Sequence, residues 1–201
     1  MIIYLLCEPK EKRLRIISQD IKEKYTMRTI IYIFGLLLLT GCSSQYPNKD
    51  ITGQIFPAVV GSTLEKTSLS IPSDLTDDLT LLLIGYVQNS QFDIDRWLIA
   101  LDVTETNVKV YEVPTIQGLF PEMFSTVIDN GMRAGIPKPL WQGVVTIYDD
   151  GEKIQAFTGN ENAANTRVVL LNSEGEILYF YDQGFAVDAL NKLRSALIAN
   201  K

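Results

Sequence analysis

The chain has 201 residues, a formal net charge of −6, two cysteines and no histidine. Its length suits one domain with a single core of ordinary size and leaves no room for a second. Its negative charge and lack of any basic run argue against nucleic acid and an anionic lipid surface as binding partners.

The first 41 residues are typical of targeting sequence. The apolar run at 30–39 would form about 15 Å of helix, too short to span a bilayer. Arg28 precedes the run and small residues follow it, as in a cleaved signal peptide, which we expect at 27–41. Residues 1–26 are interpreted as an extension from a mis-assigned start codon; a genuine extension is the alternative.

Residues 39–42, Leu-Thr-Gly-Cys, resemble the lipobox of bacterial lipoproteins. In that family the cysteine sulfur receives a diacylglycerol, the peptidase cuts before the cysteine, and the new amino end is usually acylated. The resemblance implies that Cys42 is lipidated and that the protein contacts a membrane through this anchor, where several acyl chains hold more firmly than one. Ser43 next to it resembles outer-membrane lipoproteins of Gram-negative bacteria, which implies the outer membrane, facing the periplasm.

Cysteine and histidine usage excludes several chemistries. Cys7 lies in the interpreted extension, and Cys42 would be a thioether, so the mature body would have no free thiol, disulfide or imidazole. Thiol-disulfide exchange, Ser-His-Asp and Cys-His catalysis and His- or Cys-based zinc sites are therefore excluded. The acidic groups follow no EF-hand spacing, and we expect turn and cap residues rather than metal ligands. No cofactor is predicted.

Polar residues with Pro and Gly at 42–57 predict a tether, followed by one domain at 58–201. The continuous apolar run at 79–86 predicts a strand buried on both faces. A polar loop leads into a helix in which Asp93 caps or charges the first turn. The inward stripe of that helix is Ile94, Trp97, Leu98 and Leu101.

The remaining pattern continues to alternate between strands and helices. Strands are predicted at 108–116 and 143–148, with a helix at 121–135 between them and a short helix, EKIQAF, after them. A hairpin at 168–181 and a final helix from about 187 to 198 complete the chain. This order predicts a three-layer α/β/α sandwich with a mixed central sheet.

Two stretches, "DLTLLLIGYVQNSQFDIDRW" at 78–97 and "NTRVVLLNSEGEILYFYDQG" at 165–184, resemble the thioredoxin-like superfamily. The first matches its strand, active-site loop and helix, and the second its later hairpin. Within the superfamily, the short helix followed by VVLLNSEGEILYF looks most like the branch that includes the mitochondrial ATP synthase assembly factors. The resemblance covers roughly residues 55–198 and implies a thioredoxin-like fold.

The chain departs from this superfamily at its active site. A redox member carries two cysteines where this chain has Gln88, Asn89, Ser90 and Gln91, and a helix amino end that stabilises a thiolate. The position that usually holds a cis-proline falls near Thr166, where a cis bond would cost roughly 3 kcal/mol. We therefore expect the fold to be kept for binding rather than for redox chemistry.

The candidate binding loop comprises residues 88–91, with Thr166 and Arg167 nearby. It lies at the carboxyl end of a central strand, where α/β sheets place ligands; an ordinary solvated loop is the alternative. Arg167 could pair with an anionic ligand or simply balance nearby acid. Trp97 and Trp141 are interpreted as core or edge aromatics, the alternative being anchors for a partner.

Two functions remain. The first is a non-catalytic envelope lipoprotein that binds a protein partner; the resemblance to the assembly-factor branch implies a role in assembly of an envelope complex. It predicts an exposed apolar or aromatic patch and no deep polar pocket. The second is a small-molecule-binding protein or a carboxylate-dependent hydrolase, which predicts a cleft that holds a carboxylate beside the loop or Arg167, with an acid or base of displaced pKa.

Overall fold

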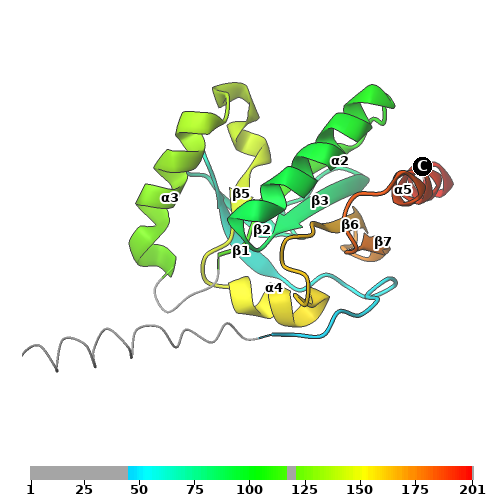
Figure 1. The fold of residues 1–201 in the computed structure, drawn as a ribbon, viewed down its shortest axis with the longest axis horizontal. Coiled ribbons are helices and arrows are strands. Elements are labelled where there is room, and N and C mark those ends of the chain that lie inside the picture. Colours follow the sequence, from blue (N-terminus) through cyan, green and yellow to red (C-terminus); the bar gives the residue numbers. More distant parts are fainter. Residues whose placement is uncertain (1–44, 117–120, 201) are drawn as a thin grey trace, which may run out of the picture. The chain divides into compact units, whose positions relative to one another are not determined.

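The computed structural model describes residues 45–116 and 121–200 (Figure 1). The predicted extension, the predicted signal peptide and Cys42 lie outside this range. Within it, residues 45–200 belong to one compact unit that contains two sheets. No helix among the described residues has the length and apolarity needed to cross a bilayer.

The larger sheet has the strand order β4-β3-β6-β7. Its strands are β3 (Leu79–Gly85), β4 (Lys109–Pro114), β6 (Arg167–Asn172) and β7 (Ile177–Tyr181). β3 pairs parallel with β4 and antiparallel with β6, and β6 pairs antiparallel with β7, so the predicted mixed sheet is confirmed. Six of the seven β3 residues are buried, as the continuous apolar run predicts for a strand covered on both faces.

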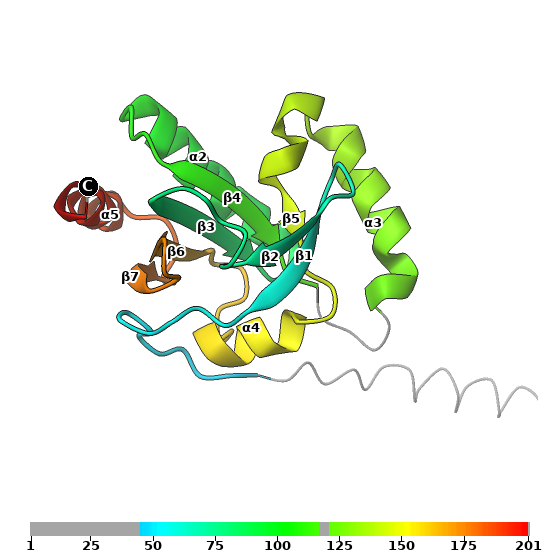
Figure 2. The same ribbon diagram turned by 180° about the vertical axis from the view of Figure 1, so that it is seen from behind.

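Alternate residues of β3 face two separate cores. Leu81 and Leu83 pack against α2 (Gln91–Val103) and α5 (Val187–Ala199). Leu82 and Ile84 face the other core, which includes Ile154 of α4 (Gly151–Thr158). Figures 1 and 2 show α2 and α5 on one face of the sheet and α4 on the other, as a three-layer sandwich requires.

A second sheet, with the order β2-β1-β5, was not predicted. It consists of β1 (Val59–Thr63), β2 (Ser68–Ile71) and β5 (Val145–Thr146). The strand predicted at 143–148 is thus only two residues long, although the bridges Glu112↔Val144 and Thr115↔Ile147 join its surroundings to β4. These strands are too short to give a clear sequence signal, because their alternation extends over only two or three residues per face.

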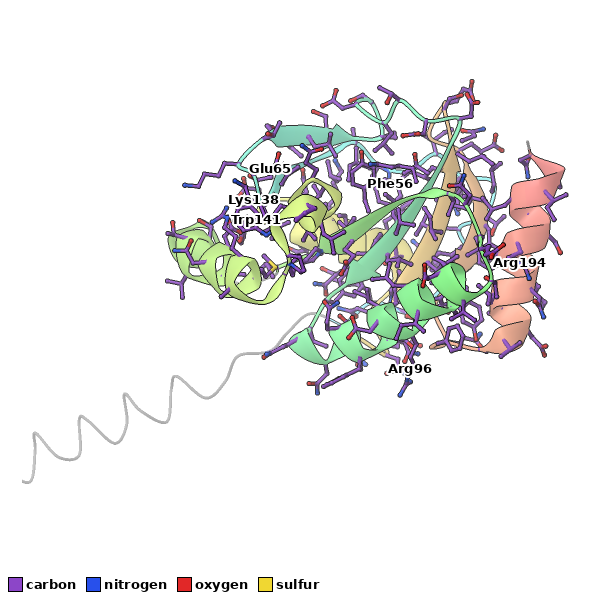
Figure 3. All side chains as sticks on the ribbon, turned by 90° about the horizontal axis from the view of Figure 1, so that it is seen from above. Phe56, Glu65, Arg96, Lys138, Trp141 and Arg194 are labelled. Atoms are coloured by element: carbon purple, nitrogen blue, oxygen red, sulfur yellow. The ribbon has the colours of Figure 1, made fainter. Side chains whose placement is uncertain are left out.

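A helical segment follows β4 and lies at the side of the sheet (Figure 1). It contains α3 (Pro121–Gly135), which has the predicted bounds, and η3 (Lys138–Gly143). Trp141 of η3 is half-buried, and its Nε1 donates a hydrogen bond to the Ile136 carbonyl at 2.8 Å. Figure 3 shows Trp141, Lys138 and Glu65 gathered at this corner. Trp97 is fully buried, and its ring meets that of Phe185 edge-on at 5.3 Å, so both tryptophans are packed residues.

The interpretation of residues 42–57 as a free tether is wrong for its described part, 45–57. The side chains of Ile51 and Phe56 are almost completely buried in the core that contains Leu82. Backbone hydrogen bonds also join Gly53 N–H to the Ile177 carbonyl and Phe56 N–H to the Gly175 carbonyl, each at 2.8 Å. Burial of two large apolar side chains outweighs the polar composition that suggested a linker.

Candidate functional site

The predicted binding loop forms the junction between β3 and α2. Gln88, Asn89 and Ser90 make a single 3-10 turn, η2 (Gln88–Ser90), and Gln91 begins α2. This places the loop at the carboxyl end of a central strand, as predicted. Gln88 and Asn89 are exposed, whereas Ser90 is buried.

Ser90 holds the loop against the strand that precedes it. Its hydroxyl donates a hydrogen bond to the Val87 carbonyl at 2.7 Å. Gly85 packs directly beneath it, because a Cβ at that position would collide with the Ser90 hydroxyl. The side chain at 90 is therefore a structural group, and a nucleophilic role for its hydroxyl has no support in its surroundings.

Gln91 connects the loop to two carboxylates. Its amide nitrogen donates to Asp95 Oδ1 at 2.9 Å and to Glu112 Oε2 at 3.1 Å. Burial raises the pKa of the Glu112 carboxyl and the charge of Asp95 adds to this, while the Gln91 hydrogen bond opposes it. A carboxyl group of displaced pKa thus lies beside the predicted loop, which sequence reasoning could not assign to Glu112.

Thr166 lies immediately before β6 and is fully buried. The cis peptide bond among the described residues is Ile71–Pro72, so the bond that precedes Thr166 is trans. Unlike a proline, Thr166 has a backbone N–H, and this group donates to Asp93 Oδ2 at 2.9 Å. The other Asp93 oxygen accepts the Phe185 N–H at 2.7 Å.

Asp93 was predicted to cap or charge the first turn of its helix. It does lie in the first turn of α2, so the prediction that it charges this turn is confirmed, whereas the N-cap position is occupied by Ser90. Its carboxylate instead joins three segments, the start of α2, the start of β6 and the loop before α5. Only the tertiary fold brings these two N–H donors to Asp93.

Arg167 does not lie open at the mouth of the strand, which corrects the expectation from the sequence. Its guanidinium is fully buried and donates to the carbonyl oxygens of Gly159, Asn162 and Asn165 at 2.7–3.1 Å. Burial lowers the pKa of Arg167. The side chain still carries its charge and offers only hydrogen-bond donors, which suits the carbonyl oxygens around it. It therefore contributes to packing beneath the loop rather than to a surface that a ligand reaches.

Tyr86 directly precedes the loop and packs against Arg167. The Arg167 guanidinium lies 4.9 Å from the centre of its ring, a cation–π contact, and its hydroxyl hydrogen-bonds the Thr158 hydroxyl. Burial raises the pKa of the Tyr86 phenol to about 12. Tyr86 is thus a neutral, packed phenol at neutral pH.

The exposed feature beside the loop is apolar, and sequence reasoning missed it. Four large apolar residues are 46–75 % exposed and form what we call the α2 surface: Val87, Phe92, Ile99 and Val103. Phe92, Ile99 and Val103 have the spacing i, i+7, i+11, which places them on one outward stripe of the helix. Arg96 is exposed and follows Phe92 by four residues, about one turn of the helix, so it borders the same stripe. The sequence signal for this surface was the second apolar stripe of the helix, separate from the inward stripe.

Residues 88–91 line neither of two described pockets. One, of about 270 Å³, is lined by residues 48–50 and 180–183. The other, of about 570 Å³, is lined by residues at the opposite end of the sheet, among them Asp77, Lys109 and Asn200. Within the described ranges, no group of three or more acidic or sulfur ligands is placed to hold a metal ion.

No family model matches the chain, and no curated protein matches it. Solved structures do. A putative electron transfer protein from Aquifex aeolicus is similar with a TM-score of 0.53 and 15% identity, covering 75% of this chain and 98% of that one. A member of the Sco family of cytochrome c oxidase assembly proteins gives 0.52 and 11%, covering 76% and 96%. A thiol peroxidase from Chromobacterium violaceum gives 0.50 and 12%, covering 75% and 90%.

At these identities the similarity concerns the fold alone. In this chain the shared fold comprises a mixed sheet with the parallel β3–β4 pair, covered by α4 on one face and by α2 and α5 on the other. The chain therefore has a thioredoxin-like fold of the α/β class with a mixed central sheet.

Proposed function

We propose that this protein is a lipid-anchored envelope lipoprotein whose thioredoxin-like domain binds a protein partner through the α2 surface and performs no thiol chemistry. The observation that carries the proposal is the α2 surface itself. Four large apolar side chains stand exposed along the loop and helix that, in redox members of this fold, carry the thiols.

The energetics favour an apolar contact at this surface. Fully burying a side chain such as Phe or Ile is worth about 1.5–3 kcal/mol, and interface anchors are concentrated among large aromatic and apolar residues. An exposed apolar stripe on the surface of a domain is typical of interaction sites. Arg96 on the same face adds a charged residue of a kind that interfaces favour.

The polar groups around the loop support binding rather than catalysis. Ser90, Asp93 and Arg167 donate to or accept from protein groups, and none of the three is exposed. With cysteines and histidine lacking from residues 43–201, the loop has no nucleophile of the kind this fold uses.

A role in the assembly of an envelope complex belongs to the same proposal. It rests on the sequence resemblance to a branch with assembly factors, and one structural neighbour is itself described as belonging to an assembly family. Attachment through Cys42 to the outer membrane would restrict the partner to the periplasmic side.

In-cell photo-crosslinking tests the proposal. A photoreactive amino acid is placed at Val87, which is 46 % exposed, in the full chain, and captured proteins are identified by mass spectrometry. We expect one enriched protein, lost in Phe92→Ser but retained in Leu140→Ser, a matched change at an exposed apolar residue of η3. Equal capture in the Phe92→Ser and Leu140→Ser variants would contradict the proposal, as would the lack of any enriched protein. The same experiment on a Cys42→Ala variant shows whether capture requires the lipid anchor.

A second candidate function has one observation in its favour. Glu112, with its raised pKa, lies next to Asp95 and Gln91 beside the loop, as expected of a small-molecule site or a carboxylate-dependent hydrolase. Co-purification of a small molecule that is lost in Glu112→Gln, with no captured protein, would favour this candidate over the first.

A further inference from the structure

The segment that follows the predicted lipidation site is fixed to the domain almost from its first described residue. Tyr46 N–H donates to Asn160 Oδ1 at 2.7 Å, and Asn160 N–H donates back to the Tyr46 carbonyl at 3.0 Å. The Tyr46 hydroxyl reaches Glu152 Oε1 at 2.6 Å. Three hydrogen bonds thus hold one residue to α4 and the loop that follows it.

Asn48 makes a second attachment. Its Oδ1 accepts from the Glu161 N–H at 3.1 Å and from the buried Arg167 guanidinium at 3.3 Å. Gly159, at φ 80°, allows the close approach, since a Cβ there would lie 2.6 Å from the Pro47 carbonyl oxygen. We call residues 46–48 together with Asn160, Glu161 and Arg167 the clamp.

The clamp lies beneath the candidate binding loop. Arg167 contacts Tyr86, which directly precedes the Val87–Gln88 pair, and Thr166 next to it donates to Asp93 of α2. Both connections run through the end of the larger sheet at which β3 finishes and β6 begins. The segment that leads to Cys42 therefore joins the domain at the end that carries the loop.

Chain length then limits where the lipid can be. Four residue steps separate Cys42 from Tyr46, and they span at most about 14 Å. A compact unit of 157 residues has a radius of gyration of about 15 Å and is therefore about 40 Å across. The anchor reaches well under half this width.

We propose that the clamp orients the domain on the bilayer, with the loop end of the sheet held next to the lipid surface and the opposite end directed away from it. This inference rests on the proposed lipidation of Cys42 and adds a fixed membrane-facing surface, made by the clamp. Because the domain is acidic, the anchor and clamp provide the proximity rather than attraction to anionic lipid.

Headgroup quenching tests the orientation. The acylated full protein is reconstituted in phosphatidylcholine vesicles that contain lipids with a quencher on the headgroup. A fluorophore is attached at Glu161→Cys, in the clamp, or at Asn107→Cys, an exposed residue just before β4 at the far end. We expect quenching several-fold stronger at position 161 than at 107; equal quenching overturns the proposal.

A lengthened anchor gives the matched control. Insertion of about a dozen Gly and Ser residues between Ser44 and Gln45 leaves every clamp contact in place and adds roughly 20 Å of reach. We expect the difference between positions 161 and 107 to disappear, and its persistence overturns the proposal. Mass spectrometry of the same samples reports acylation separately. Lack of acylation at Cys42 overturns both this inference and the anchored lipoprotein, whereas acylation with equal quenching overturns this inference alone.

Discussion

At the residue scale, the most informative side chain is Asp93. Its two oxygens accept the buried N–H of Thr166 at 2.9 Å and the N–H of Phe185 at 2.7 Å. Where this fold usually has a proline, threonine adds a donor that needs an acceptor, and Asp93 supplies it. Asp93 thus forms a hydrogen-bonded junction between α2, β6 and the loop before α5.

Asp93→Asn tests this junction. The amide keeps one acceptor but turns an NH2 group toward the second donor, so we expect a loss of about 1–3 kcal/mol in the free energy of unfolding, measured in urea. Asp95→Asn, an exposed change two residues along the same helix, should alter it by no more than about 0.5 kcal/mol. Equal effects of the two substitutions would show that Asp93 does not hold the junction.

Glu112 has a measurable pH signature. Burial raises its pKa, so the folded state binds this proton more tightly than the unfolded state, and ionisation costs stability as the pH rises above the ordinary value of 4.5. Glu112→Gln should therefore increase the free energy of unfolding at pH 7, with the gain vanishing as the pH falls below 4.5. Glu174→Gln, at the exposed hairpin turn, should show no such pH-dependent gain.

At the element scale, α2 and the amino-terminal segment, residues 45–57, pack differently from what their sequence patterns predict. α2 is apolar on two faces, one packed through Trp97 and one exposed through Phe92. The segment at 45–57 looks like a linker but packs as part of the domain through Ile51 and Phe56. In both cases a few apolar side chains decide how the segment packs against the domain or stays exposed.

Arg167→Gln tests how the amino-terminal segment is held. Because several carbonyl oxygens and Asn48 lose their donors, the free energy of unfolding should fall by about 2–4 kcal/mol. The Glu161 amide, which donates to Asn48, should exchange faster with solvent. Arg96→Gln, an exposed change on α2, is the control and should change neither measurement.

At the scale of the whole molecule, β3 joins the two cores. Leu82 faces the core that contains Ile154, and Leu83 faces the core that contains Trp97. Loss of either layer would expose the same central strand. The domain should therefore unfold in one cooperative step rather than core by core.

Leu82→Ala tests this cooperativity. Removing a fully buried leucine should cost about 2–5 kcal/mol. The transitions followed by tryptophan fluorescence, which includes Trp97 on the other face, and by far-UV circular dichroism should shift together. Separate transitions would indicate that the cores unfold independently, and Ile99→Ala, at an exposed apolar residue, should have little effect.

Much of the fold was predictable because it depends on local signals. The buried strand β3, the inward stripe of α2, the helix α3, the β6–β7 hairpin and α5 all follow from apolar periodicity and turn residues. The sheet of β1, β2 and β5 was missed because its strands are short and because β5 pairs with β1 across more than 80 residues of sequence. The loop at 88–91 was placed correctly, whereas the exposure of Arg167 was not.

The sequence by itself determined the order of the elements, the lack of histidine and of thiols beyond Cys42, and the polar character of the loop, since these depend on composition and local spacing. Only the tertiary structure decided that Arg167 is buried, that Asp93 receives two backbone donors, and that residues 46–48 are clamped beneath the loop. These features join residues that are far apart in the chain, and burial and hydrogen bonding between such residues have no local sequence signature.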